Sequence, residues 1–252
     1  MPSPSESVPH PGGVFQTRKT VLNIGCGPRG ITVIGNPAFP EEEWREVRLD
    51  IDPGVAPDIV ASMTDMAAVP DGTMDAVWSS HNLEHLFPHE VPAALREFLR
   101  VLKPGGQLRL AVPDLQGVAA LVAQGGLEDT LYMSNVGPIT PLDVIYGYGA
   151  AIAAGNHFMA HRTGFTAQTL GRALQAAGFE PVVLWRLEEA YELQAKAFRP
   201  PAPAGALREF GIGPDSVAGC RPAACGAPFR DGLHRSAADL LAGISWGTGD
   251  RR

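Results

Sequence analysis

Glycines and acids at fixed spacing give this chain of 252 residues its clearest chemical signal. Gly25, Gly27 and Gly30 follow a short apolar run, which predicts a buried strand ending at a tight turn. Glycine has no Cβ, so the backbone of such a turn takes unusual dihedrals and lets a flat ligand come close. Asp50 lies where a nucleotide-binding fingerprint has its ribose-binding acid. Together these residues predict a site for a small molecule that carries a ribose.

The stretch after the turn narrows the choice of ligand. NAD, FAD and S-adenosylmethionine (SAM) all place a ribose against such an acid. A dinucleotide also needs the N-terminus of a long helix for its pyrophosphate, yet residues 31–40 are β-branched and interrupted by Gly35, Pro37 and Pro40. SAM carries a sulfonium and an amino-acid tail in place of phosphates, so the stretch favours SAM. Nicotinamide remains the alternative.

Three further residues are candidates for the ribose and the adenine. Asp50 ends a predicted strand at 45–50 and is the preferred ribose ligand. Asp52 is the second candidate for the ribose, and its alternative role is to cap the turn at Pro53. Met63 and Asp65 follow a predicted third strand at 58–62. A thioether can cover an adenine ring, and a carboxylate can accept from its exocyclic amine. A core methionine and a loop aspartate are equally consistent with the pattern.

A histidine-rich stretch follows the fourth predicted strand, at 74–79, and suggests metal chemistry. His81-x-x-Glu84-His85 matches an inverted zincin motif, and His89 continues its spacing. That motif requires a helix, which Pro88 limits to little more than one turn. We therefore expect no metal here. Ser80 and His81 should instead lie near the reacting centre.

Helices and strands must carry these residues to one place. Apolar residues on one face predict a core-facing helix at 90–102, and period-two alternation predicts a fifth strand at 107–113. A helix capped by Thr166 and two strands, at 181–185 and 191–198, follow. The short link between these strands predicts an antiparallel hairpin.

Residues 115–164 are longer than an ordinary connection, and we interpret them as a lid over the substrate. Helices are expected at 115–123 and 141–154. His157 and His161, with His81, are candidates for a general base because imidazole titrates near neutral pH. The candidate contacts to the substrate are polar or aromatic residues: Tyr146, Tyr148, Asn156 and Arg162.

Composition limits the class of partner. The net charge of −7 and the pI near 5.5 argue against nucleic acid as the main ligand. We therefore expect a small-molecule substrate. Residues 1–17 are expected to be a mobile leader without a signal peptide, and no apolar run reaches membrane-spanning length. The predicted protein is cytoplasmic, with one domain at 18–199.

The sequence of residues 200–252 supports few functional predictions. A Pro/Gly-rich linker starts at residue 200, and Cys220, Cys225 and His234 are too sparse for a zinc site. The apolar patch at 240–246 would dock on the domain or on a second subunit, which leaves a homodimer open.

Four motifs in order resemble those of class I SAM-dependent methyltransferases. They are LNIGCGP at 22–28, LDID at 49–52, DAVWSSHNLEHL at 75–86 and RVLKPGG at 100–106. The resemblance implies an α/β fold with a Rossmann-like, doubly wound, seven-stranded and mostly parallel sheet whose last strand is antiparallel.

The same resemblance implies roles for single residues. Gly25 and Gly27 would approach the methionine portion of SAM, Asp50 the ribose, Met63 the adenine, and Ser80 or His81 the methyl donor. Asn23 stands where many members have an acid. The remaining expected donor contacts from these motifs are Cys26 and Ile51. The implied activity is methyl transfer from SAM to an oxygen or nitrogen of a small molecule; a nicotinamide-dependent oxidoreductase and a non-catalytic SAM-binding protein are the alternatives.

Overall fold

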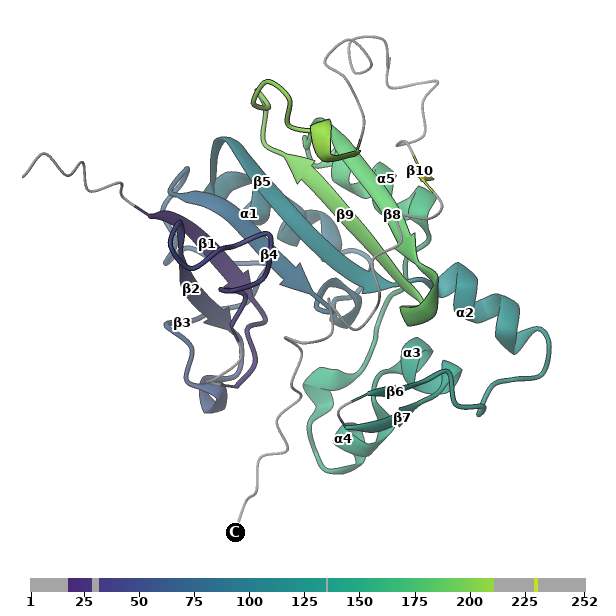
Figure 1. Ribbon diagram of the computed structural model, residues 1–252. Coiled ribbons are helices and arrows are strands. Elements are labelled where there is room, and N and C mark those ends of the chain that lie inside the picture. The colour runs from purple at the N-terminus through teal and green to yellow at the C-terminus, as the bar shows by residue number, and fades with distance from the viewer. Residues whose placement is uncertain (1–17, 29–31, 135, 211–228, 231–252) are drawn as a thin grey trace, which may run out of the picture.

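The computed structural model describes residues 18–28, 32–134, 136–210 and 229–230. Its centre is one sheet in the order β10-β8-β9-β5-β4-β1-β2-β3 (Figure 1). Only β9 runs antiparallel to its neighbours β5 and β8, whereas the other pairs are parallel. The strands are β1 Lys19–Ile24, β2 Trp44–Asp50, β3 Ile59–Val60, β4 Met74–Ser80, β5 Leu102–Pro113, β8 Val182–Leu187, β9 Glu192–Phe198 and β10 Phe229–Arg230.

This topology confirms the predicted fold class. Seven of these strands, β1 to β5 with β8 and β9, form the expected mostly parallel sheet, and β9 is the last of the seven along the chain. β10 adds a short eighth strand beside β8, which the sequence did not predict. Strand order reverses around β1, which lies between β2 and β4. In open parallel sheets, ligands bind beyond the carboxyl ends of the strands at this reversal.

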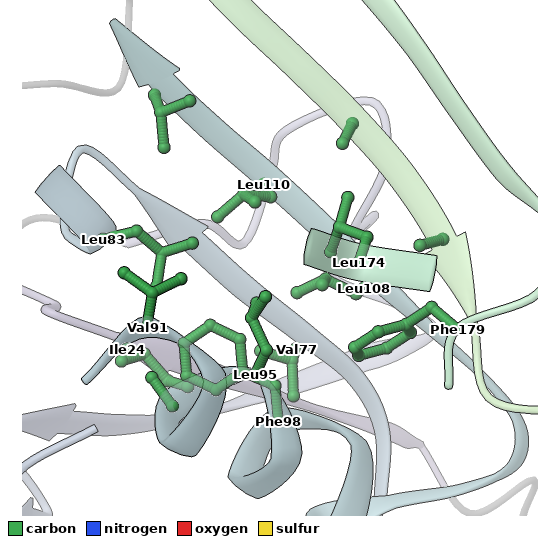
Figure 2. Close-up of a cluster of buried hydrophobic side chains, with 14 of the residues drawn as sticks. Ile24, Val77, Leu83, Val91, Leu95, Phe98, Leu108, Leu110, Leu174 and Phe179 are labelled. Atoms are coloured by element: carbon green, nitrogen blue, oxygen red, sulfur yellow. The ribbon is translucent and has the colours of Figure 1, made fainter. Parts of the chain in front are cut away.

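Helices α1 (Val91–Val101) and α5 (Ala167–Ala176) cover one face of the sheet. Leu95 and Phe98 of α1 are completely buried and lie over Val77 and Leu108 of the sheet (Figure 2). Both helices match their predictions, and Thr166 caps α5 as expected. The largest cluster of buried side chains lies on this face. Burying each large apolar side chain contributes about 1.5–3 kcal/mol to the free energy of folding.

The opposite face is covered without an α-helix in the described residues. Val33 and Phe39 pack on Val21 and Trp44, and the Phe39 and Trp44 rings meet edge to face at 5.0 Å. The described residues from 32 to 43 form turns, as the interrupted sequence after the glycines predicted. On the other half of this face, the 3-10 turn Arg208–Phe210 contributes Phe210.

The insertion lies beyond the carboxyl ends of β4 and β5 (Figure 1). It contains α2 (Leu115–Val122), the hairpin β6 (Tyr132–Ser134) and β7 (Gly137–Ile139), α3 (Pro141–Tyr146) and α4 (Gly149–Ala153). The expectation of one helix at 141–154 is wrong because the chain turns at Gly147, whose φ is +96°. A Cβ at Gly147 would lie 1.9 Å from the Met159 carbonyl oxygen, so only glycine fits there.

Some strand limits also differ from prediction. β5 begins at Leu102, and residues 103–106 bulge out of its pairing with β4, because Met74 pairs with Leu102 but Ala76 with Gln107. The remaining elements are the short 3-10 turns Pro53–Val55, Leu83–His85, His157–Met159 and Glu188–Ala190. Among the described residues, none of the helices combines the length and apolar character needed to cross a membrane.

Candidate functional site

The glycine turn at the end of β1 is held by the backbone of β2 and by one side chain of the loop after β4. Gly25 and Gly27 have φ of +65° and +64°, and the Gly25 amide donates to the Leu49 carbonyl at 2.8 Å. Asn82, which is buried, donates from Nδ2 to the Ile24 carbonyl at 2.8 Å. A Cβ on Gly25 would lie 1.8 Å from Asn82 Oδ1, so the missing side chain makes room for Asn82.

Asp50 lies at the carboxyl end of β2 with both oxygens engaged by backbone amides. Oδ2 accepts from the Gly27 amide at 3.0 Å, and Oδ1 accepts from the Asp52 amide at 2.9 Å. An ionised carboxylate has about four acceptor positions, so Asp50 can still accept from a ribose. Ile51 beside it is 50% exposed and offers apolar surface. Asp52 accepts from the Gly54 amide at 2.7 Å, which is the turn-capping contact of its alternative role.

Asn23 and Cys26 are both buried next to this turn. Asn23 Nδ2 donates to Glu46 Oε1 at 2.6 Å, and the same carboxylate accepts from the Thr32 hydroxyl and the Val33 amide. The Asn23 side chain is therefore engaged by Glu46 of β2, and its expected contact with SAM stays a prediction. Burial raises the pKa of the Cys26 thiol to about 11, although Arg48 lowers it in part. Cys26 is therefore a neutral thiol at physiological pH.

Met63 and Asp65 lie after β3 at the same edge of the sheet. Met63 is half-buried and packs against the core cluster. Asp65 is exposed, and its Oδ1 accepts from the Ala67 amide at 3.3 Å. These described contacts are the ones that a core methionine and a loop aspartate would make; the adenine role stays a prediction.

His81 follows Ser80 at the end of β4 and is fixed between two buried carboxylates. Its Nε2 lies 2.6 Å from Glu192 Oε2 on β9, and its Nδ1 lies 3.4 Å from Glu84 Oε1. Burial alone would lower the pKa of His81, but the two carboxylates outweigh it and raise the pKa to about 10. The ring is thus an imidazolium at neutral pH and cannot accept a proton from a substrate.

A cavity of about 140 Å³ opens between His81 and the insertion. Of the predicted residues, His81, Tyr148 and His161 line it. The Tyr148 hydroxyl donates to the Val136 carbonyl at 2.9 Å. Tyr132 of β6 also lines the cavity, where burial and nearby Glu192 raise the pKa of its phenol to about 12.

The other predicted acceptor contacts lie elsewhere. Tyr146 and Arg162 line a second cavity, which His161 and Glu84 share. Tyr146 is largely exposed, and the Arg162 guanidinium lies 4.8 Å from the Phe87 ring centroid. Asn156 and His157 are exposed and line neither cavity.

His85 and His161 meet where the two cavities adjoin. Their rings lie 4.9 Å apart between centroids. His85 Nδ1 lies 3.2 Å from the Ala160 carbonyl, and His161 Nδ1 lies 2.8 Å from the Val144 carbonyl. A carbonyl only accepts, so Nδ1 carries a proton in both rings, and in the neutral form of each ring the lone pair is on Nε2. Burial lowers the pKa of His161, which makes the neutral ring the form present at neutral pH.

Comparison with known proteins agrees with this geometry. Residues 22–110, about a third of the chain, match the family model described as "Methyltransferase domain". The resemblance drawn from the four sequence motifs is confirmed for this segment, which runs from β1 into β5.

One curated relative shows how much of the chain is matched. A protein of Aspergillus luteorubrus named "Probable methyltransferase ltbC" is 33% identical over an alignment of 109 residues, and the match covers 35% of this chain and 38% of the relative. The chain thus matches well under half of that relative's length.

Solved structures resemble the chain more distantly than this relative does. A SAM-dependent methyltransferase from Archaeoglobus fulgidus is 16% identical with a TM-score of 0.45, covering 73% of this chain and 87% of that one. The 1,6-didemethyltoxoflavin-N1-methyltransferase of Burkholderia thailandensis, solved with 1,6-didemethyltoxoflavin and S-adenosylhomocysteine, is 17% identical with a TM-score of 0.43, covering 72% and 71%. Similarity at this level carries no information on substrate.

Three residues of the site were missed by sequence reasoning. Asn82 lies inside the motif at 75–86. Its side-chain amide, which can donate a hydrogen bond to a backbone carbonyl, was the signal that could have identified it. Tyr132 belongs to a strand of three residues, too short for a visible alternation. Glu192 is 111 residues from His81 along the chain, and nothing local predicts that contact.

Proposed function

We propose that this protein is a SAM-dependent methyltransferase that transfers a methyl group to an oxygen or nitrogen of a small molecule. One observation carries the proposal. His81 lines the cavity while the next residue, Asn82, bonds the Ile24 carbonyl at the glycine turn. The expected donor site and the cavity are therefore neighbours, joined through two consecutive residues.

The residues at the sheet edge fit SAM. Gly25 and Gly27 follow β1, Asp50 ends β2 with Ile51 directly after it, and Ser80 ends β4. Asp50 retains acceptor positions for ribose hydroxyls, and exposed Ile51 offers apolar surface for a flat ring. SAM, when bound, supplies a methyl group that its sulfonium already activates.

The chain's own residues then need mainly to position the acceptor. Holding two reacting groups in line contributes on the order of 7–11 kcal/mol. Of the three candidate bases, His161 is the best placed, since its neutral ring lines the cavity. His81 serves to hold Glu84 and Glu192, and exposed His157 stays a prediction without a contact to the cavity.

Other parts of the proposal rest on sequence alone or on related proteins. The matched Aspergillus relative is named a methyltransferase, which agrees with the proposed reaction. Tyr148 is the proposed acceptor contact in the first cavity, and Tyr146 and Arg162 in the second. Asn156, a homodimer, a cytoplasmic location and the lack of nucleic-acid or membrane partners remain sequence-based expectations.

The test is calorimetric titration with S-adenosylhomocysteine, with NADH as the parallel ligand. We expect micromolar binding, about −8 kcal/mol, and no heat from NADH. Binding of NADH alone would favour the oxidoreductase. Donor binding without methylation of any acceptor in a screen of small hydroxyl and amine compounds would favour a non-catalytic SAM-binding protein.

A matched pair of variants locates the ribose. Asp50→Asn should weaken S-adenosylhomocysteine binding about 10- to 100-fold, because hydrogen bonds to a charged group contribute about 1.5–3 kcal/mol. Asp52→Asn is the control, since that side chain already caps Gly54. Equal effects from the two variants would contradict the assignment of Asp50.

A further inference from the structure

Glu84 is buried in an unusual state. The residue is 1% exposed, and neither carboxylate oxygen has a hydrogen-bond partner among the described residues. Buried carboxylates without partners are costly, and they are normally paired or bound to a metal. His81 Nδ1 lies 3.4 Å from Oε1, close enough for an ion pair but without hydrogen-bond geometry. A better partner for this carboxylate is therefore expected.

Two imidazoles stand beside it with the lone pairs that a metal requires. His85 and His161 each place Nδ1 on a backbone carbonyl, of Ala160 and Val144 respectively. This arrangement fixes the ring orientation and makes Nε2 the nitrogen that can bind a metal, which is how metal-binding histidines are usually held. One ligand atom from each of Glu84, His85 and His161 lies within 4.8 Å of the others.

We propose that Glu84, His85 and His161 form a binding site for a divalent transition-metal ion of the zinc type. Two histidines and one glutamate are a donor set that zinc accepts, with a further position left open. Metal–ligand distances of about 2.0–2.1 Å put ligand atoms about 3.4 Å apart around a tetrahedral ion. The three side chains would need to close by at most about 1.4 Å. Imidazole donors select zinc-like ions over magnesium or calcium.

Neighbouring side chains hold the proposed metal ligand Glu84 in place. His81 bridges Glu84 to Glu192, whose other oxygen accepts from Gln194 Nε2 at 2.7 Å. Such partners orient a metal-binding carboxylate. The expectation that residues 81–89 hold no metal considered a single helix; this site takes its third ligand from His161, in the insertion. The 3-10 turn Leu83–His85 replaces that helix.

The open side of the site faces the acceptor cavities. His85 and His161 line the first cavity, and Glu84 and His161 line the second. A bound ion would therefore meet an acceptor there. Resting on the proposed methyl transfer, this favours acceptors with an ionisable oxygen, such as phenols or hydroxy acids, and makes His161 a metal ligand instead of a base.

The experiment measures metal binding directly, by titrating EDTA-treated protein with Zn²⁺ and with Co²⁺, whose visible absorption reports its ligands. The parent protein carries Cys220→Ser, Cys225→Ser and His234→Asn, because these residues lie outside the described part and are also metal-binding types. We expect one ion per chain. Glu84→Gln and His161→Asn should each weaken Zn²⁺ binding more than the about 10- to 100-fold that outer partners alone contribute.

The matched control is His89→Asn, an exposed histidine of the same stretch, which should bind Zn²⁺ like the parent. S-adenosylhomocysteine binding by each variant checks the fold. If Glu84→Gln fails to fold, half-buried His161→Asn decides. Absence of Co²⁺ absorption, unchanged Zn²⁺ affinity in His161→Asn, or equal binding of Mg²⁺ would each overturn the site. Zinc binding without S-adenosylhomocysteine binding would support the site while refuting the proposed methyl transfer.

Discussion

The glycine turn at the end of β1 and the cavity beneath the insertion are neighbours, yet different contacts hold them. At the turn, backbone amides do most of the work: Gly25 bonds Leu49, and Asp50 accepts from two amides. At the cavity, buried charges meet, with His81 between Glu84 and Glu192. The first region depends on backbone shape and the second on the balance of charge.

This difference predicts which substitutions destabilise each region. A turn made of backbone contacts tolerates most side-chain changes but not an added Cβ. A buried charge cluster tolerates changes of shape but not the loss of one charge, because the remaining charges stay buried without a partner. Three sets of variants separate the two cases, and they are given from the largest expected effect to the smallest.

Removing the central cation of the cluster should cost the most. His81→Gln leaves the carboxylates of Glu84 and Glu192 without it, and breaking a buried pair costs about 3–5 kcal/mol. Urea unfolding of EDTA-treated protein measures the loss, with His89→Asn as the exposed control, expected within about 0.5 kcal/mol of wild type. A loss below about 1 kcal/mol would mean that charge does not hold this region.

Adding a Cβ to the turn should follow. Gly25→Ala forces alanine into a left-handed conformation, about 1–2 kcal/mol, and displaces Asn82 from its buried hydrogen bonds, about 1–3 kcal/mol more. We expect a total of about 2–5 kcal/mol and loss of S-adenosylhomocysteine binding.

Gly35 provides the matched control for that variant. Its φ is +88°, but a Cβ there meets nothing within 4 Å. Gly35→Ala should therefore cost only the conformational part, about 1–2 kcal/mol. Equal losses at Gly25 and Gly35 would show that the contact with Asn82 is unimportant.

Two helix caps give the smallest and most local effects. Thr140 and Thr166 form the same type of capping box, at α3 in the insertion and at α5 on the core. Each change to alanine should cost about 1 kcal/mol. Hydrogen exchange should speed up within 132–161 for Thr140→Ala and across the core for Thr166→Ala. Identical exchange patterns would indicate that the insertion and the sheet unfold as one unit.

The same contrast explains what the sequence could predict. The donor side consists of strand ends and turns, whose glycines, acids and apolar runs are local signals. β4 and α1 were accordingly predicted nearly to the residue, and Gly25 and Asp50 lie at the strand ends that the motifs implied. The donor role of Met63 and Asp65 depends on a ligand, so pattern alone does not decide it.

The cavity, which we propose as the acceptor site, depends on contacts between distant segments. His81 meets Glu192 across 111 residues, and Glu84 meets His161 only after the insertion folds back. The three-residue strands β6 and β7 carry no recognisable period. The sequence therefore predicted that His161 lies in the insertion, but it could not predict its contact with His85.

The position of β9 has a consequence for the order of folding. β5 is central in the finished sheet, yet its partner β9 is synthesised about 80 residues later. Until then, the edge of β5 lies open along Leu108, Leu110 and Val112, which are apolar. Open apolar edges invite pairing with other chains. A nascent chain halted before residue 192 would thus be prone to aggregation, and it would lack the carboxylate of Glu192 that neutralises His81.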